Sequence, residues 1–254
     1  MSNGSETYQR LIEVAERRGA GYLALLDPDR MTPDELEARA LMCAEAGADA
    51  LLVGTSLMFS SNHKDFLARV RDRLSIPVIS FPGSAGHVTP LVDAILFLSM
   101  ISGRNPELLI GQQAKAAPLL RDYGTEVIST GYMLIESGTL SSVEYMSNTR
   151  PMPRNKPDIA MAHALAAEYI GMKMIYLEAG SGAAQAVPDA MIRAVSDYVS
   201  LPVIVGGGIR DAETAAAKVA AGARFVVTGT VVEEEGSGLE RHLRELSAAV
   251  HVNG

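Results

Sequence analysis

Eight short apolar runs, separated by longer amphipathic stretches, constrain the fold of this chain more than any other feature. The runs cover residues 22–26, 50–54, 77–81, 94–99, 126–135, 173–178, 202–208 and 224–229. They are nearly continuous in apolar residues, which is typical of parallel strands buried on both faces. The sequence therefore predicts a parallel sheet whose strands alternate with covering helices.

The stretches between the runs carry helix signals. Residues 32–47, TPDELEARALMCAEAG, have proline and acidic residues near the start and glycine at the end, the asymmetry that marks the two ends of a helix. An N-terminal helix is expected at about residues 5–18. Eight strand–helix units in 254 residues match the count and length of a single-domain (β/α)8 barrel, or TIM barrel. A doubly wound sheet is the alternative, although it usually needs fewer strands at this length.

The chain shows no sign of a second domain. Residues 74–86, LSIPVISFPGSAG, resemble residues 199–211, VSLPVIVGGGIRD, a weak indication that half a barrel was duplicated. One long irregular segment covers about residues 137–157, and loops of this length are usually functional or mobile. No stretch resembles an interdomain linker, so one domain over residues 1–254 is expected.

Composition limits the compartment and the partners. The net charge of -8 argues against a nucleic-acid partner, which needs clustered lysine and arginine. Small phosphorylated ligands are still allowed, because backbone amides can hold them. Cys43 is the only cysteine, so no internal disulfide is possible and a reducing compartment is expected. Residues 1–20 are too polar for a signal peptide and no apolar run has transmembrane length, which together predict a cytoplasmic protein.

Glycines gather where the later strands are expected to end, and in TIM barrels the active site lies at those ends. Gly180 and Gly182 follow the sixth run, Gly207 and Gly208 end the seventh, and Gly229 with Thr230 follows the eighth. Their amides can surround a phosphate, and tight turns without a ligand are the alternative. The glycines therefore predict a phosphorylated ligand better than any one reaction.

Polar residues after the first two runs indicate a metal site. Asp27 follows the first run and Ser56 the second, and Mg²⁺ accepts such oxygens while leaving positions for a substrate phosphate. A helix cap or an ion pair with Arg30 is an equal alternative for Asp27. His87 is the one histidine in a strand-end loop, where a surface or capping role is favoured over a functional one. The cysteine and histidine positions do not have zinc-site spacing.

The fourth and fifth runs end in apolar residues. Residues 93–103, DAILFLSMISG, fit an ordinary barrel core, whereas Tyr132 at a strand end could line a groove for a long apolar substrate. Arg104, just beyond the fourth run, is a candidate for contact with the diphosphate of such a substrate. Three basic residues of the long segment either meet a diphosphate or form a solvated loop: Arg150, Arg154 and Lys156.

Four motifs carry a family resemblance: DPDR (27–30), GTS (54–56), YLEAGSG (176–182) and VGGGI (205–209). In order and spacing they resemble those of the geranylgeranylglyceryl phosphate synthase family, including its heptaprenylglyceryl phosphate synthase-like members. The resemblance covers nearly the whole chain, and YLEAGSG with the downstream glycines is its most specific part. The chain departs from the family at Arg30, where lysine is common, and at Thr55, where a second glycine is common.

The resemblance implies a transferase of prenyl groups on a TIM barrel. The enzyme would join a polyprenyl diphosphate, expected to be geranylgeranyl diphosphate, to the C3 hydroxyl of sn-glycerol 1-phosphate. Diphosphate would leave and an ether-lipid precursor would form. Heptaprenylglyceryl phosphate synthase is the alternative within the family. The resemblance also implies a homo-oligomer, either a dimer or a hexamer, with peripheral membrane contact for the product.

The resemblance further implies roles for individual residues. Glu178 would accept the proton of the hydroxyl, assisted by Tyr176, while Asp27 and Ser56 would hold Mg²⁺ as the cofactor. An unpaired glutamate beside a phosphate would be costly if it were only structural. The glycerol phosphate would contact Tyr176, Leu177, Glu178, Ala179, Gly180, Ser181, Gly182, Gly207, Gly208, Gly229 and Thr230.

Two functions outside the family stay open. A phosphosugar isomerase or aldolase would share the phosphate site but would need paired carboxylates or a Schiff-base lysine near the strand ends. Lys173 begins the sixth run and so lies at the wrong end of the barrel, while Asp27 remains available as an acid or base. A non-catalytic phosphate-binding protein is the other alternative, but that function would not explain why the carboxylate, the metal site and the apolar groove occur together.

Overall fold

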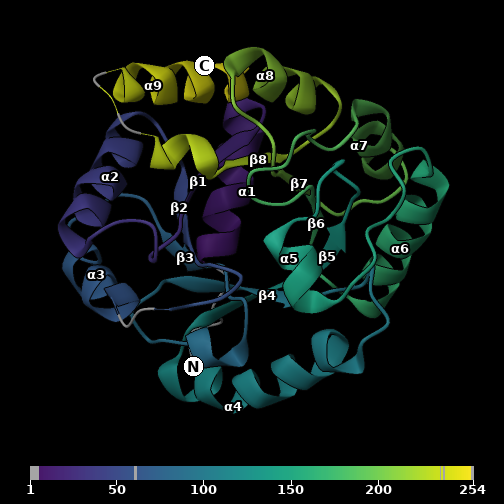
Figure 1. Ribbon diagram of the computed structural model, residues 1–254, viewed down its shortest axis with the longest axis horizontal. Coiled ribbons are helices and arrows are strands. Elements are labelled where there is room, and N and C mark those ends of the chain that lie inside the picture. The colour runs from purple at the N-terminus through teal and green to yellow at the C-terminus, as the bar shows by residue number, and fades with distance from the viewer. Residues whose placement is uncertain (1–5, 60–61, 235, 237, 253–254) are drawn as a thin grey trace.

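The computed structural model describes residues 6–59, 62–234, 236 and 238–252. Within these residues, eight parallel strands pair in chain order and close into a barrel ringed by helices (Figure 1). The predicted single-domain TIM barrel is confirmed, and the doubly wound sheet is wrong. The strands are β1 (Gly21–Leu26), β2 (Ala50–Val53), β3 (Val78–Ser80), β4 (Ala94–Ser99), β5 (Glu126–Leu134), β6 (Met174–Glu178), β7 (Val203–Gly206) and β8 (Phe225–Thr228).

Helices follow the strands around the outside of the barrel. Thr32 caps the helix predicted from TPDELEARALMCAEAG and forms a reciprocal capping box with Glu35, which satisfies N–H groups of the first turn. The outer helices are α2 (Pro33–Glu45), α3 (Asn62–Val70), α4 (Gln112–Tyr123), α6 (Pro157–Ile170), α7 (Asp189–Ser196), α8 (Ala212–Ala220) and α9 (Leu239–Val250). Three short turns of other helix types are η1 (Ala85–His87), η2 (Glu107–Gly111) and η3 (Thr230–Glu233).

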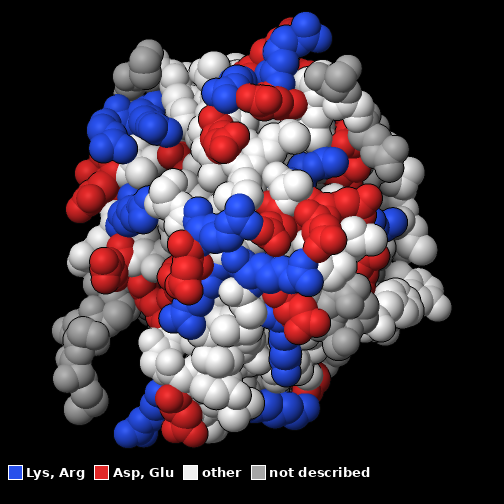
Figure 2. Space-filling model, turned by 90° about the vertical axis from the view of Figure 1, so that its left-hand side faces the viewer, with Lys and Arg blue, Asp and Glu red and all other residues white. Residues whose placement is uncertain are grey.

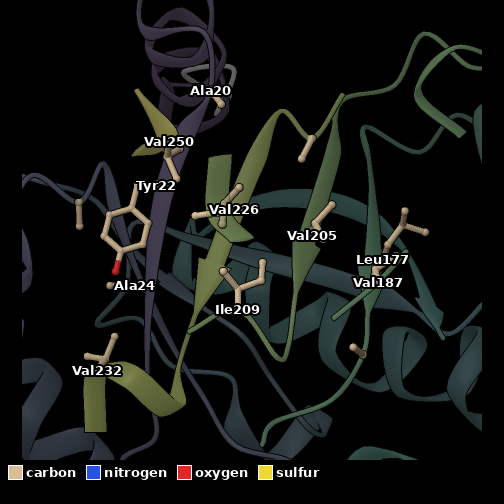
Figure 3. Close-up of a cluster of buried hydrophobic side chains, with 14 of the residues drawn as sticks. Ala20, Tyr22, Ala24, Leu177, Val187, Val205, Ile209, Val226, Val232 and Val250 are labelled. Atoms are coloured by element: carbon tan, nitrogen blue, oxygen red, sulfur yellow. The ribbon is translucent and has the colours of Figure 1, made fainter. Parts of the chain in front are cut away.

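The strands bury side chains on both faces, which explains their nearly continuous apolar sequences. One set packs outward against the helices and includes Leu177, Val205 and Val226 (Figure 3). The alternate set fills the barrel and includes Tyr176 and Ile204. Because side chains alternate along a strand, neighbouring residues such as Tyr176 and Leu177 belong to different layers.

Helix α1 (Glu6–Arg18) crosses the N-terminal end of the barrel (Figure 1). Its Leu11 and Ala15 pack with the side chains that fill the barrel. The carboxylate of Glu126, at the start of β5, accepts hydrogen bonds from Thr7 N at 2.7 Å and Tyr8 N at 2.9 Å, which satisfies N–H groups that a helix cannot pair itself. The predicted helix at about residues 5–18 is thus present from Glu6, and residue 5 lies outside the described residues.

The segment over residues 137–157, predicted to be irregular, contains helix α5 (Ser142–Ser147). Ser141 caps this helix, because its Oγ accepts a hydrogen bond from Glu144 N at 3.2 Å. The helix ends at Asn148, whose φ of 49° is left-handed. A serine followed three residues later by a glutamate is a known helix-start signal, so the irregular assignment was wrong for a reason visible in the sequence.

The outer face at α2 and α3 carries charges of both signs, interspersed (Figure 2). Arg69 pairs with Asp34 at 2.5 Å between these helices, and Arg73 pairs with Glu37. This face therefore offers no continuous basic surface to a nucleic-acid backbone. Among the described helices, none combines the length and the apolar character needed to cross a bilayer.

Candidate functional site

A cavity of about 1050 Å³ opens at the C-terminal ends of the strands. Residues at or just beyond these strand ends form much of its wall, and α5 supplies Val143 and Tyr145. This is the end of the barrel at which the chain's glycines and strand-end polar residues were predicted to gather. The volume suits a ligand larger than a simple metabolite.

Glu178 is the last residue of β6 and faces the cavity. It is only 5% exposed, and its Oε1 accepts a hydrogen bond from Gly180 N at 2.6 Å. Burial raises the pKa of the carboxyl from 4.5 to about 7, opposed by the Gly180 N–H and by the hydroxyls of Tyr176 and Tyr132. Glu178 can therefore take up or release a proton near neutral pH.

An aromatic cluster stands beside this carboxyl. The rings of Phe81 and Tyr176 stack with centroids 5.3 Å apart, and Tyr132 is tilted against Tyr176 at the same separation. Tyr132 and Tyr176 are register partners on β5 and β6, so both project into the barrel. Burial raises the pKa of each tyrosine well above its usual value, which keeps both hydroxyls protonated.

Glycines form the wall next to Glu178. Gly207 and Gly208 have φ angles of 80° and 72°, so β7 ends at Gly206 and the predicted run 202–208 is too long at that end. A Cβ on Gly207 would lie 2.6 Å from Glu178 Oε1 and 2.5 Å from Gly180 O. The loop after β7 therefore packs directly against the loop after β6, with the carboxylate at the contact.

The predicted phosphate-binding residues mostly meet at this wall. Ser181, Gly182, Gly207, Gly208, Gly229 and Thr230 all line the cavity. Gly180 and Gly182 have φ angles of 102° and 69°, in the left-handed region that favours glycine. Concave loops with left-handed residues bind anions through successive N–H groups, so this wall is suited to a phosphate.

Two residues predicted to contact the same ligand lie elsewhere. Leu177 and Ala179 belong to the outer core between the strands and the helices, as Figure 3 shows for Leu177. The alternation of side chains along β6 sends Tyr176 and Glu178 inward and Leu177 outward. Gly180 does not line the cavity either, but its N–H holds the Glu178 carboxylate. The side chains of Leu177 and Ala179 therefore do not face the cavity, and their contact with the ligand stays a prediction.

Asp27 and Ser56 also line the cavity, after β1 and β2, and β1 pairs with β8, the strand that leads to Gly229 and Thr230. Asp27 Oδ1 accepts a hydrogen bond from Asp29 N at 3.0 Å, and its Oδ2 lies 3.8 Å from Arg30 Nε. No group of three or more His, Cys, Asp or Glu residues forms a metal cluster within the described ranges. One carboxylate and one hydroxyl still fit Mg²⁺, which binds few protein oxygens and takes its remaining ligands from water and substrate phosphates.

The remaining wall is largely apolar. It is built by β4, η1, η2 and α4, and Tyr132 lies where it meets the polar part. This side is the groove expected at the ends of the fourth and fifth runs. Its lining includes Val88, Ile95, Phe97, Leu98, Leu108 and Ala116. A ligand with a polar head and a long apolar tail would match the two halves of the cavity.

Arg104, predicted to contact a diphosphate, is not part of the cavity wall. Its Nη1 donates to Gly103 O at 2.7 Å and its Nη2 lies 3.3 Å from His163 Nε2 on α6. The turn after β4, closed by a hydrogen bond from Gly103 N to Met100 O at 3.0 Å, directs the side chain toward the helix layer. A basic residue after a strand was too weak a signal to fix this direction.

Further residues line the cavity although no motif above gives them a role. Phe81 ends the third run, Arg210 follows VGGGI, and Glu233 lies in η3. Burial raises the pKa of Glu233, Arg30 lowers it and Asp27 raises it. The arginine next to the glycine motif was a readable signal for Arg210. His87 also lines the cavity, and its Nδ1 accepts a hydrogen bond from Gly83 N at 3.1 Å.

The raised pKa of Glu178 predicts an unusual pH dependence of stability. Its folded-state pKa of about 7 lies above the usual 4.5, so the folded protein binds this proton more tightly than the unfolded chain. The stabilisation is complete below the unfolded pKa and is lost as pH rises through the folded one. The total loss is about 3 kcal/mol. Glu178→Gln removes the titration. We therefore expect the free energy of unfolding of the variant to rise relative to that of the wild type between pH 5 and 8.

Urea unfolding curves of both proteins at several pH values measure this difference. A constant difference between the two free energies of unfolding from pH 5 to 8 would show that the carboxyl titrates normally in the folded state. A widening difference supports the buried, protonatable carboxyl.

Comparison with known proteins identifies the family. The model of the PcrB family matches residues 12–250. The geranylgeranylglyceryl phosphate synthase of Chitinophaga pinensis is 42% identical over 97% of this chain and 96% of its own length. That of Methanothrix thermoacetophila is 42% identical over 95% of this chain and 94% of its own.

A solved structure agrees with these relatives. It is the (S)-3-O-geranylgeranylglyceryl phosphate synthase of Thermoplasma acidophilum in complex with its substrate sn-glycerol-1-phosphate. It has a TM-score of 0.89 and 32% identity, over 95% of this chain and 98% of that one. The resemblance stated from the four motifs and the prediction of a prenyl-transferring enzyme are confirmed, and this chain belongs to the PcrB family.

Proposed function

We propose that this enzyme joins geranylgeranyl diphosphate to the C3 hydroxyl of sn-glycerol 1-phosphate, forming an ether-lipid precursor and releasing diphosphate. One observation carries the proposal: the buried carboxyl of Glu178 touches the glycine wall at Gly207. A phosphate on that wall would bring its attached alcohol to a group that can accept a proton. The relatives' shared name and the bound substrate in the Thermoplasma structure support the choice of glycerol phosphate.

The glycine wall would hold the phosphate end. Backbone N–H groups carry no net charge, so they bind the anion without forming an ion pair with Glu178. Gly207 and Gly208 allow the close approach because they have no side chains. The carboxyl is then free for the hydroxyl at the other end of the three-carbon ligand.

Glu178 would act as the general base of the transfer. The C3 oxygen attacks the first carbon of the prenyl chain, and the bond from that carbon to the diphosphate oxygen breaks. The diphosphate leaves with the bonding electron pair, and the hydroxyl proton passes to the Glu178 carboxylate. A base with a pKa of about 7 suits this role, because it is available as a carboxylate near neutral pH and basic enough to accept the proton.

The apolar half would hold the prenyl chain, with the aromatic cluster at its inner end. Phe81 and Tyr132 line the cavity next to Tyr176. Aromatic faces attract cationic charge, so these rings would favour the positive charge that develops on the allylic carbon as diphosphate departs. The same walls would limit water, which competes with the alcohol.

Asp27 and Ser56 would hold Mg²⁺, which supplies charge to neutralise the departing diphosphate. We expect Asp27→Asn to raise the Mg²⁺ concentration for half-maximal activity by about 10- to 100-fold, the range for one lost charged contact. Binding of Mn²⁺, followed by electron paramagnetic resonance, should weaken in parallel. Asp34→Asn on the exposed face of α2 is the matched control.

Undiminished activity of the wild type in excess chelator would refute a metal requirement. Activity loss in Asp27→Asn with unchanged Mn²⁺ binding would assign Asp27 another role, such as its contact with Arg30.

A product assay tests the function directly. Radiolabelled sn-glycerol 1-phosphate is incubated with Mg²⁺ and diphosphates of several chain lengths, and the label entering the organic phase is measured. We expect the highest kcat/KM with geranylgeranyl diphosphate. A preference for heptaprenyl diphosphate would instead make the enzyme a heptaprenylglyceryl phosphate synthase, and no product with any diphosphate would refute the proposal.

The Schiff-base form of the isomerase or aldolase alternative receives no support from the cavity. No lysine lines it within the part of the chain that is described. Lys173 lies at the closed end of the barrel, where its Nζ donates to Val127 O at 3.4 Å and stands 5.2 Å from the centroid of the Tyr8 ring. A Schiff-base mechanism therefore has no amine at the site.

We further propose, from the resemblance, a cytoplasmic homo-oligomer, either a dimer or a hexamer, with peripheral membrane contact for product release. Tyr169 and Ile170 at the end of α6 are 80% and 73% exposed, which gives an apolar surface where copies could meet. Native mass spectrometry would give the number of copies.

A further inference from the structure

The loop between β6 and α7, residues 179–188, contributes Ser181 and Gly182 to the glycine wall but has no regular secondary structure. Such a loop must satisfy its carbonyl groups without a helix or a sheet. In this structure, cationic side chains from other elements satisfy several of them. These cations come from three different elements, and together they can hold the loop in one conformation.

Arg210 holds the turn that carries Ser181 and Gly182. Its Nη2 donates to Ala183 O at 2.8 Å and to Gly182 O at 3.3 Å. The peptide group that joins Gly182 to Ala183 is also held at its nitrogen, which donates to Gly180 O at 3.2 Å. Because a peptide unit is planar, fixing both its oxygen and its nitrogen fixes its orientation.

Arg154 holds the middle of the loop from outside the cavity. Its Nη2 donates to Ala186 O and its Nη1 to Glu136 O, each at 2.9 Å. It lines a smaller cavity of about 490 Å³ behind the loop, together with Arg210 and Lys218, but does not line the main cavity. The sequence left Arg154 either to meet a diphosphate or to lie in a solvated loop, whereas in the structure its guanidinium binds two carbonyl oxygens outside the main cavity.

Lys218 holds the end of the loop. It is buried on α8, and its Nζ donates to Val187 O at 2.9 Å and to Asp189 Oδ1 at 2.5 Å. The cations from the 137–157 segment, the β7–α8 loop and α8 thus contact successive parts of one loop. Gly208 completes the contact, because a Cβ there would lie 2.9 Å from Ala186 N.

We propose that Arg154, with Arg210 and Lys218, positions the β6–α7 loop so that Ser181 and Gly182 present a preformed phosphate site. The proposal rests on the proposed function for the identity of the ligand, sn-glycerol 1-phosphate. Arg154 is a positioning residue and not a catalytic one, because it binds only Ala186 O of the loop and Glu136 O beyond β5 and does not line the main cavity. A preformed site binds more tightly, since the loop's ordering cost is met before the ligand arrives.

Arg154→Met gives the sharpest test, because the side chain keeps much of its length and loses both hydrogen bonds. We expect KM for sn-glycerol 1-phosphate to rise by about 10-fold or more, the usual effect of losing charged hydrogen bonds. We expect little change in kcat, because Glu178 keeps its contact with Gly180. Hydrogen exchange of the ligand-free variant should be faster at residues 181–187 and unchanged in α3.

Arg154→Lys separates positioning from charge. A single ammonium cannot reproduce the fork that spans two carbonyls, so we expect a smaller but clear rise in KM. If Arg154→Lys behaves as wild type, the net charge alone matters and the positioning role is refuted. This variant also decides the question if Arg154→Met does not fold. Arg193→Met, at an exposed arginine of α7, is the control.

Other outcomes are equally decisive. A folded Arg154→Met protein with unchanged KM and unchanged exchange would overturn the proposal, as would a fall in kcat at constant KM. Failure of the wild type to bind sn-glycerol 1-phosphate would refute the proposed function instead. The exchange experiment needs no ligand, so it would still report whether Arg154 fixes the loop.

Discussion

Replacing Glu178 with glutamine is expected to lower kcat by about 10²–10⁴-fold, the usual contribution of a general base. The glutamine side chain would have nearly the same shape and would still accept the hydrogen bond that Gly180 N gives to Glu178 Oε1 at 2.6 Å. Binding of sn-glycerol 1-phosphate should therefore change little. Steady-state kinetics for turnover and isothermal titration calorimetry for binding measure the two effects separately.

The pH dependence of wild-type activity is a second test of the Glu178 carboxyl. Because a base must be deprotonated, kcat/KM should rise with pH and level off above the free enzyme's Glu178 pKa of about 7, whereas the residual activity of Glu178→Gln should lack this step. Glu213→Gln, in the first turn of α8 and away from the cavity wall, is the control. Equal losses of binding and turnover in Glu178→Gln would assign this residue to holding the substrate.

Gly207→Ala is expected to abolish most binding of sn-glycerol 1-phosphate and to destabilise the fold. The new Cβ would lie within 2.6 Å of Gly180 N, Gly180 O and Glu178 Oε1, so backbone atoms on both loops would have to move. The residue would also keep a φ of 80°, which costs an alanine about 1–2 kcal/mol. Overpacking adds about 1–3 kcal/mol.

Gly124→Ala separates these two costs. Gly124 ends α4 with a φ of 68°, and a Cβ there would meet nothing within 4 Å. It should therefore show only the backbone cost, with normal ligand binding. Urea unfolding and calorimetry compare the variants, and an equal loss of stability in both would mean that the contact between the two loops is not tight.

The barrel could be predicted from the sequence because burial on both faces leaves a strong local signal. The run 94–99 matches β4 at both ends, and the other strands begin or end within a few residues of their runs. Differences concentrate at β7, where Gly207 and Gly208 adopt left-handed angles that end the strand. Glycine adopts extended and left-handed backbone conformations equally readily, so the sequence alone did not show where the strand ends.

The site was predicted in part. The glycines and Glu178 meet as expected, because the ends of parallel strands lie at one end of a barrel. Leu177 and Ala179 were included because the motif is continuous, although the alternation of side chains along a strand already directed the Leu177 side chain away from the cavity. Arg104 and Arg154 could not be placed, since the direction of a long side chain on a loop depends on tertiary contacts.

The pKa of Glu178 was also beyond the sequence. A glutamate at a strand end is compatible with a solvated or a buried carboxyl, and its depth depends on the aromatic side chains that follow β3 and lie on β5. Tertiary burial raises the pKa of this carboxyl to about 7, which is what makes the residue suitable for proton transfer.

Helix α1 covers the N-terminal end of the barrel and is held there by Glu126, and the main cavity, as lined by the described residues, opens at the opposite end. Both reactants and both products would have to pass the same rim, and the phosphate ligand would sit against the deeply buried Glu178. The reactant that goes deepest would enter first, and the long-tailed product would be the last to leave. Access through this opening, rather than the chemical step, would then set the order of substrate binding and product release in each turnover.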